Sequence, residues 1–227
     1  MHKKRAEVPF DTSFFKKDTS QGIHRTITDT FTFIYNSNHW SGINSVSGNG
    51  SDSSQTQEIR KHLPHLVEHL KIKVMLDLPC GDFNWMNAIN LKLEKYIGAD
   101  IVKELIESNL RKYENGIRRF QVIDIIHDPL PDADLLFCRD CFVHLSNDNI
   151  LKALANIKGS KIKYLLTSTF TECEKNEDIT TGDWRIINLE KSPFCLPVPK
   201  LIINEKCTEG GGTYGDKSLG LWVVQEI

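Results

Sequence analysis

The chain has 227 residues, with 28 Lys and Arg against 30 Asp and Glu and a formal net charge of -2 at neutral pH. Its 40% apolar content excludes a wholly disordered chain and allows a sizeable core. The near-neutral charge argues against a dedicated nucleic-acid-binding protein, which usually carries a basic excess. No apolar run reaches the ~18 residues of a membrane-spanning helix, and no secretory signal pattern begins the sequence. We therefore expect a cytoplasmic protein that binds neither nucleic acid nor a membrane.

The N-terminal third mixes two kinds of sequence. Residues 1–36 combine charged and aromatic side chains and are expected to be partly helical. Residues 37–57 are rich in Ser, Gly and Asn, which is typical of a flexible linker. Trp40 within this stretch indicates instead a segment that folds over a ligand, and both interpretations remain open.

Apolar residues at helical spacing predict a helix after this stretch. Ser53 or Ser54 is expected to cap its N-terminus. Pro64 falls inside the pattern and predicts a kink or two short helices.

From Lys73 onward, short apolar runs alternate with amphipathic helical segments. Five runs are predicted as strands, at residues 74–78, 95–100, 119–124, 134–138 and 163–169. Such alternation predicts a parallel sheet that is covered on both faces. After a long irregular segment, residues 201–207 and 219–226 flank a glycine-rich loop and predict an antiparallel hairpin.

Acidic residues follow the first three predicted strands. Ligands of parallel sheets bind at the carboxyl ends of the strands, where Asp82, Asp100 and Asp124 are expected to lie. Asp100 follows Asp77 at roughly the twenty-residue distance at which a carboxylate binds ribose hydroxyls. Asp124 can accept a hydrogen bond from an exocyclic amine while Ile125 packs on the base. Together these residues predict an adenosine pocket.

The turn after the first strand, DLPCGD, has a single glycine. A G-x-G-x-x-G pattern would favour NAD or FAD, whose pyrophosphate binds at a helix N-terminus. The acidic Asp82 would repel a pyrophosphate but attract a cationic amine or a sulfonium. The turn therefore argues against dinucleotides.

Residues 74–227 resemble the class I S-adenosylmethionine-dependent methyltransferases. VMLDLPCGDF is similar to their first motif, YIGADI and FQVIDI to their two strand-end acids, and DLLFCRDCFVHLS to their fourth-strand motif. The sequence departs from the usual D-x-G-x-G-x-G at Pro79 and Cys80 but keeps Gly81. The resemblance implies an α/β fold with a Rossmann-like, doubly wound, seven-stranded sheet, mostly parallel with an antiparallel last strand. An N-terminal helical cap or lid of residues 1–70 would precede a cofactor-binding domain of residues 71–227.

This resemblance implies S-adenosylmethionine as the cofactor and S-adenosylhomocysteine as its product. Asp100 would bind the ribose hydroxyls and Asp124 the adenine amine. Asp77 and Gly81 would line the methionyl part. The segment that contains Trp40 is expected to fold over the same ligand. The complete cofactor-binding prediction is Trp40, Ser47, Asp77, Pro79, Gly81, Asp82, Asp100, Ile101, Asp124, Ile125 and Arg139.

Three residues near the fourth strand are the catalytic candidates. The same resemblance places Arg139 and Asp140 where methyl donor and acceptor meet. His144 is the candidate base, because its ordinary pKa suits neutral pH. In a helical turn, Asp140 would lie on the same face and orient the imidazole. The alternative is that His144 packs structurally behind the strand.

The resemblance to these methyltransferases also implies that the segment between the fifth and sixth strands shapes the acceptor pocket. Trp184 and Phe194 offer apolar surfaces and Arg185 an anion contact, a mixture that suits a sugar or a phosphorylated small molecule. The alternative is a packed surface loop.

We therefore predict a methyltransferase that acts on a small molecule or a glycan, at oxygen, as a monomer or homodimer. No metal is expected, because the C-x-x-C pair Cys138 and Cys141 has no second pair at zinc-site spacing. An NAD-dependent oxidoreductase and an inactive methyltransferase fold that serves as a binding subunit remain the alternatives.

Overall fold

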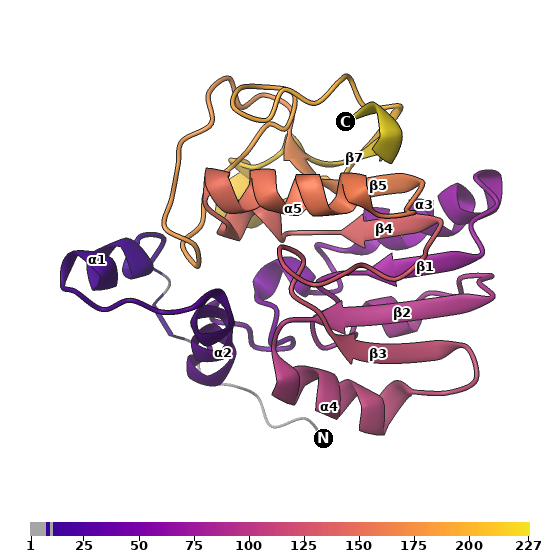
Figure 1. Cartoon of the computed structure of the whole chain (residues 1–227), viewed down its shortest axis with the longest axis horizontal. Coiled ribbons are helices and arrows are strands. Elements are labelled where there is room, and N and C mark those ends of the chain that lie inside the picture. Colours follow the sequence, from indigo (N-terminus) through magenta and orange to yellow (C-terminus); the bar gives the residue numbers. More distant parts are fainter. Residues whose placement is uncertain (1–7, 10) are drawn as a thin grey trace.

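A computed structural model of the chain describes residues 8–9 and 11–227, and its centre is a seven-stranded sheet (Figure 1). The strand order is β3-β2-β1-β4-β5-β7-β6. The strands are β1 (Val74–Asp77), β2 (Lys95–Asp100), β3 (Arg118–Val122), β4 (Leu135–Cys138), β5 (Tyr164–Phe170), β6 (Leu201–Asn204) and β7 (Lys217–Val223). Strands β1 to β5 pair in parallel, whereas β7 is antiparallel to both β5 and β6. The predicted mostly parallel sheet with an antiparallel last strand is confirmed.

Two of the helices begin at a residue whose side chain caps the helix. The helices are α1 (Phe14–Ser20), α2 (Ile27–Ser37), α3 (Gln57–His69), α4 (Lys103–Tyr113) and α5 (Asn147–Gly159). Thr26 caps α2, where its hydroxyl accepts from the amide of Asp29, and Ser146 caps α5 in the same way. None of the described helices has the length and apolar character that crossing a membrane requires.

Strand residues alternate between two buried layers. Met75 and Leu135 face the layer that contains α3 and α4, whereas their neighbours Leu76 and Leu136 face the layer that contains α5. This alternation follows from the two-residue period of a strand. Both faces of the sheet are therefore apolar, as a parallel sheet requires.

The helix α3 differs from its prediction in two ways. It begins at Gln57, after Thr56, and neither predicted serine caps it. It also continues through Pro64 as a single helix. Its buried apolar side, which includes Leu63 and Leu66, packs on the sheet and outweighs the hydrogen bond that the proline lacks. This packing makes α3 a layer of the core, although the sequence analysis grouped it with the cap.

Several strands end before the predicted residue. β3 ends at Val122, so Asp124 lies in the turn beyond the strand. β6 ends at Asn204, where its pairing with β7 stops. The boundary drawn at residue 70 between cap and catalytic domain stays a prediction.

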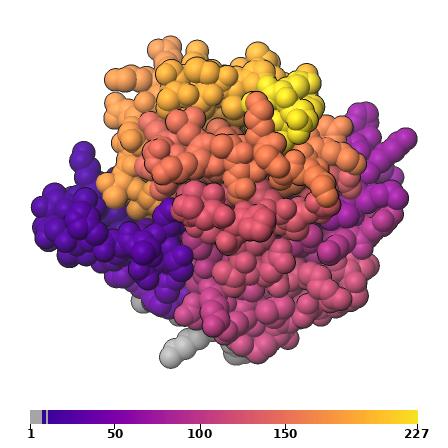
Figure 2. Space-filling model, viewed as in Figure 1, coloured from indigo at the N-terminus to yellow at the C-terminus, as the bar shows by residue number. Residues whose placement is uncertain are grey.

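The N-terminal helices lie at the carboxyl ends of the parallel strands. Figure 1 shows α1 and α2 beyond the arrowheads of β1 to β4, and the long segment after β5 descends along the same side. In the space-filling view these N-terminal residues lie against the orange residues of that segment (Figure 2). Residues 171–200 contain no helix or strand beyond an isolated bridge between Thr181 and Asp183, as the sequence predicted. The segment therefore meets the N-terminal helices where a ligand of the sheet is expected.

Candidate active site

A pocket opens at the carboxyl ends of β1 to β4, beneath α2. The space between its lining residues, including the solvent at its open mouth, is about 1130 Å³. The residues that line it include all eleven predicted cofactor-binding residues, Trp40, Ser47, Asp77, Pro79, Gly81, Asp82, Asp100, Ile101, Asp124, Ile125 and Arg139. Asp140 and His144 line it too. The structure thus brings together the whole predicted cofactor set and the three catalytic candidates.

The turn after β1 brings backbone into the pocket wall. Gly81 has a φ of +54°, and a Cβ there would lie 2.1 Å from the Ser47 hydroxyl oxygen. Its carbonyl accepts from the side-chain amide of Asn109 at 2.7 Å. Only glycine combines this backbone conformation with so close an approach. Ser47 therefore lies directly over the turn, which a freely moving linker would not do.

Asp100 ends β2 with a buried side chain. Its two oxygens accept from the backbone amides of Val102, at 3.0 Å, and Gly81, at 3.3 Å. Burial raises the pKa of this carboxyl to about 6, and the backbone hydrogen bonds oppose that rise. At neutral pH the group is mostly ionised and still has free lone pairs for a ligand hydroxyl.

Asp77 and Asp82 both line the pocket, and each has further contacts within the protein. Burial raises the pKa of Asp77 to about 8, although a hydrogen bond from the Tyr96 hydroxyl opposes the rise. Asp77 is therefore mostly neutral at pH 7. Asp82 accepts from the Ser45 hydroxyl and the Val46 amide, each at 3.1 Å. These bonds fasten the segment of Ser45 and Val46 to the turn after β1.

Asp124 lines the pocket from the turn after β3. One carboxyl oxygen accepts from the Ile126 amide at 2.8 Å, and the other lies 2.7 Å from Nδ1 of His127. The adjacent Ile125 is buried and lines the pocket. The pairing of an acid with an apolar neighbour thus has the expected place.

The end of β4 carries a buried cluster of four charges. Arg139 bonds Glu205 at 2.7 Å and lies 3.2 Å from Asp140, and Lys217 binds Asp140 at 2.8 Å. A further N–H of Arg139 donates to the Gly50 carbonyl at 2.9 Å. The two cations hold the pKa of Asp140 well below its usual range, so this carboxylate stays ionised and cannot serve as a base at neutral pH. Among the described residues that line the pocket, Arg139 is the only Lys or Arg, and it is fully engaged.

His144 sits in a single 3₁₀ turn, Phe142–His144, and its ring faces the pocket. Its Nδ1 lies 3.0 Å from the backbone carbonyl oxygen of Asp183. Trp40 stacks on the ring with a centroid distance of 4.4 Å. Burial lowers the pKa of His144 to about 4, with the charges of Arg185 and Lys217 acting in the same direction. The imidazole is therefore neutral at pH 7.

The predicted pairing of Asp140 with His144 is replaced by another partner. The carboxylate of Asp140 is taken by Lys217, Arg139 and Ser168, and Asp140 itself has a φ of +54°. The turn that follows is 3₁₀, so the expected α-helical face does not form. A backbone carbonyl, rather than a carboxylate, orients the imidazole.

The three predicted acceptor-binding residues lie outside the pocket lining. Trp184 packs edge-on against Tyr214 and Phe170, and Phe194 is buried in the same apolar layer. Arg185 is buried and donates to backbone carbonyls. These side chains close the core, as the packed-loop alternative described.

One wall of the pocket was absent from the sequence analysis. It comes from α2, whose Ile27, Phe31, Ile34 and Tyr35 all line the pocket. Their three- and four-residue spacing is an amphipathic helical signal that indicates burial, and the burial is against the ligand space. Nothing in that signal distinguishes a pocket wall from a core.

No protein-family profile and no curated protein matches the chain. Among solved structures it is similar to the N-methyltransferase NodS from Bradyrhizobium japonicum WM9, with 11% identity over 76% of this chain and 97% of the other and a TM-score of 0.55. A candidate S-adenosylmethionine-dependent methyltransferase from Listeria monocytogenes is 12% identical over 74% and 97% of the two chains, with a TM-score of 0.51.

The chain has the class I methyltransferase fold. The PH0226 protein from Pyrococcus horikoshii OT3 is similar as well, at 14% identity over 77% of this chain and 93% of that one, with a TM-score of 0.50. At such identities the likeness extends to the fold, whereas donor, acceptor and catalytic residues need arguments from the pocket itself. The pocket of this chain lies at the carboxyl ends of the parallel strands of that fold.

Proposed function

We propose that the chain is an S-adenosylmethionine-dependent methyltransferase. The observation that carries the proposal is Asp100, a buried and mostly ionised carboxylate at the end of β2, beside the backbone of Gly81 in a large pocket. The class I methyltransferase fold and the missing G-x-G-x-x-G pattern support the same conclusion. A carboxylate at this place suits the paired hydroxyls of a ribose.

The pocket residues fit such a donor. Asp100 would hold the ribose, Asp124 and Ile125 the adenine, and the Gly81 turn the methionyl part. Ser47 packs so closely on Gly81 that a Cβ there would lie 2.1 Å from its hydroxyl oxygen, and the two residues together form part of the pocket wall. Donor S-adenosylmethionine would supply an electrophilic methyl group bound to a sulfonium.

The residues at the end of β4 would prepare the acceptor. The Nδ1 of His144 faces the Asp183 carbonyl, so its Nε2 is free to accept a hydrogen bond. The donor of that bond would be the hydroxyl group of the substrate that receives the methyl group. Trp40 covers the imidazole and excludes water from it. Arg139 and Asp140 fix the floor of the site within their charge cluster. Their contribution is alignment, which is the main requirement of an in-line displacement.

The charges of the pocket favour an uncharged acceptor. Its cation Arg139 is already paired with Glu205 and Asp140, and Arg185 lies outside the pocket lining and donates to backbone carbonyls. A phosphorylated acceptor would find no free cation among the described lining residues. We therefore propose an uncharged small molecule or glycan, methylated at oxygen. A cytoplasmic location, a monomeric or homodimeric state and the absence of nucleic-acid binding stay predictions.

Calorimetry with S-adenosylmethionine, S-adenosylhomocysteine and NAD, each titrated into the full chain, tests this proposal. We expect heat of binding with the first two and none with NAD. Binding of NAD alone would favour the oxidoreductase, and no heat with any of the three would contradict both enzyme functions. A chain that binds the donor but transfers no methyl group to any candidate acceptor would favour the other alternative, an inactive methyltransferase fold that serves as a binding subunit.

A further inference from the structure

Residues 181–185 hold the backbone of the turn that carries His144. The Arg185 guanidinium donates to the carbonyls of Phe142, at 2.6 Å, and Leu145, at 2.8 Å. The Arg185 amide donates to the Val143 carbonyl at 3.2 Å, and the Gly182 amide to the His144 carbonyl at 2.8 Å. All four consecutive carbonyls of residues 142–145 thus accept from one short segment. The turn is fixed by that segment and not by a regular helix.

The same segment fixes the ring of His144. Its Nδ1 lies 3.0 Å from the Asp183 carbonyl oxygen, which can only accept a hydrogen bond. The neutral imidazole must therefore carry its proton on Nδ1, which leaves the lone pair on Nε2. Asp140, Lys217 and Arg185 are the charged groups that act on this ring.

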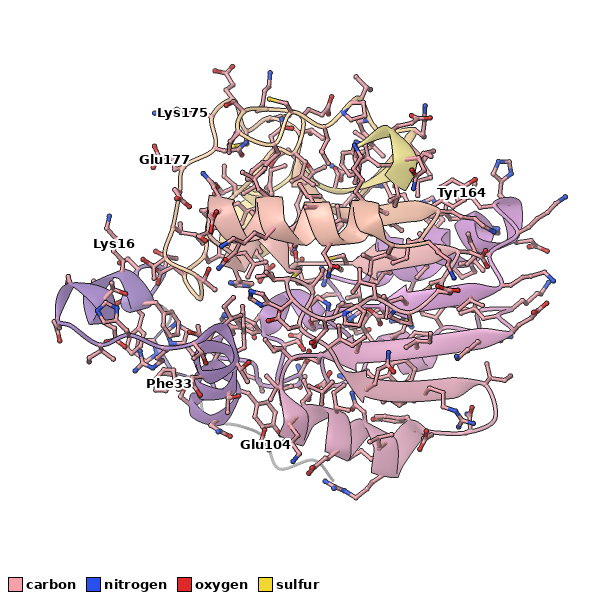
Figure 3. The ribbon with its side chains drawn as sticks, viewed as in Figure 1. Lys16, Phe33, Glu104, Tyr164, Lys175 and Glu177 are labelled. Atoms are coloured by element: carbon pink, nitrogen blue, oxygen red, sulfur yellow. The ribbon has the colours of Figure 1, made fainter. Side chains whose placement is uncertain are left out.

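Asp183 also binds the N-terminal helix α1. Its carboxylate accepts from the amides of Phe15, at 2.8 Å, and Lys16, at 3.1 Å. The Trp184 amide donates to the Thr12 carbonyl at 3.3 Å. Figure 3 shows the loop that contains Glu177 descending toward α1, on which Lys16 is labelled. One residue thus contacts the imidazole through its carbonyl and α1 through its side chain.

The burial of Arg185 supports a role beyond packing. Its side chain is buried, and none of the ion pairs among the described residues includes it. Its donors go instead to the carbonyls of Phe142, Leu145 and Glu177 and to the side chain of Asn147. A buried cation without a carboxylate partner is costly, and a neutral residue would fill the space at lower cost. The planar fork of arginine, which reaches two carbonyls of one turn, is the property that this position uses.

We propose that residues 181–185 position His144, that Arg185 is the positioning residue, and that Asp183 couples the imidazole to the docking of α1. The catalytic meaning of this coupling rests on the proposed function. With α1 docked, the Asp183 carbonyl holds the ring in its Nδ1–H form with Nε2 free. With α1 released, the carbonyl moves and the ring loses its single orientation.

The nitrogen spectrum of the histidine rings in the ligand-free chain tests the positioning. Signals missing from the His144→Gln variant belong to His144. At pH 7 the wild type is expected to show a protonated Nδ1 and a bare Nε2, and a ring protonated on Nε2 would overturn the proposal by itself. In Arg185→Lys the minor tautomer is expected to rise about fivefold to tenfold, the effect of losing one hydrogen bond. An unchanged tautomer ratio in a folded Arg185→Lys chain would remove Arg185 as the positioning residue.

Asp183→Asn tests the coupling. The variant keeps the backbone carbonyl but leaves one acceptor oxygen for the two amides of α1, so hydrogen exchange at Phe15 and Lys16 is expected to speed up about tenfold. The His144 signals should broaden or shift together with that change. Asp216→Asn is the matched control, because its carboxylate also accepts from a backbone amide, that of Glu172 at 2.9 Å, and none of its described contacts is with α1 or Arg185. Faster exchange at α1 with His144 signals identical to those of the wild type would disprove the coupling.

These measurements need no methyl donor and no acceptor. A chain that fails to bind S-adenosylmethionine could still show the fixed tautomer, and a donor-binding chain could lack it. Failure of the proposed function and failure of this inference are therefore separate results.

Discussion

The two sides of the pocket are built in different ways. At the end of β2, Asp100 is held by two backbone amides. The amide of Val102 lies just after β2 itself, and the amide of Gly81 lies in the turn after β1. At the end of β4, Arg139 is held by Glu205, which lies 66 residues away in the sequence. Lys217, which binds Asp140, lies 77 residues from it.

Because of this difference, the two sides of the pocket depend on different parts of the chain. The carboxylates of the β2 side are set by neighbouring backbone, so side-chain changes elsewhere should leave them in place. The charges of the β4 side are set by other side chains, so removing one leaves another unpaired in a buried place. Substitutions on the two sides should therefore differ in kind, with loss of ligand binding on one and loss of stability on the other.

Arg139→Met is expected to have the largest effect on stability. It leaves the buried Glu205 carboxylate without its main partner, which should lower the free energy of unfolding by about 3 to 5 kcal/mol. Urea unfolding followed by circular dichroism measures the loss. Adding Glu205→Gln to Arg139→Met should restore part of it, and a double variant no more stable than the single one would contradict the charge argument.

Asp100→Asn should act on binding instead. The amide removes a charged acceptor for ligand hydroxyls, which is expected to weaken S-adenosylmethionine binding by about 1.5 to 3 kcal/mol, or roughly tenfold to a hundredfold. Calorimetry measures the affinity. Asp132→Asn is the control, because Asp132 lies outside the pocket lining and its side chain is 70% exposed. Equal affinities in the two variants would place the ribose elsewhere.

Asp77→Asn should change how stability depends on pH. An acid whose pKa rises from 3.8 when unfolded to about 8 when folded lowers stability as pH increases between these values. Its contribution is about 1.4 kcal/mol per pH unit. Between pH 6 and pH 7 the wild type should therefore lose about 1.4 kcal/mol relative to Asp77→Asn, as urea unfolding at each pH shows. Parallel stability curves for the two chains would refute the raised pKa.

Trp184→Phe should have the smallest effect on the ligand. Trp184 packs between Phe170 and Tyr214, outside the pocket, so donor affinity is expected to change less than about twofold. Trp40→Phe, which alters the pocket wall, is the matched comparison and should weaken donor binding more. Fluorescence titration with S-adenosylhomocysteine measures both. If Trp184→Phe weakened binding as much as Trp40→Phe, the position of Trp184 outside the ligand space would be contradicted.

The same difference explains how far the sequence could predict the site. Asp100 and Asp124 were predictable because each follows its own strand and the carboxyl ends of parallel strands share one edge. Glu205 and Lys217 were not, since their place beside Arg139 depends on how the last two strands join the sheet. Arg185 was assigned an anion because arginine commonly binds anions, and the carbonyls that it binds are a property of the folded turn.

The guanidinium of Arg139 joins parts of the chain that are made at different times. It contacts Gly50 from the first quarter and Glu205 from the last tenth of the sequence. During synthesis the acids of β1 to β3 leave the ribosome long before Glu205. Ribosome-bound chains stalled before Glu205 are accordingly expected to bind donor poorly, which a filter-binding assay measures. An unfinished chain would have every residue that lines the pocket and yet lack Glu205, which holds Arg139 in place.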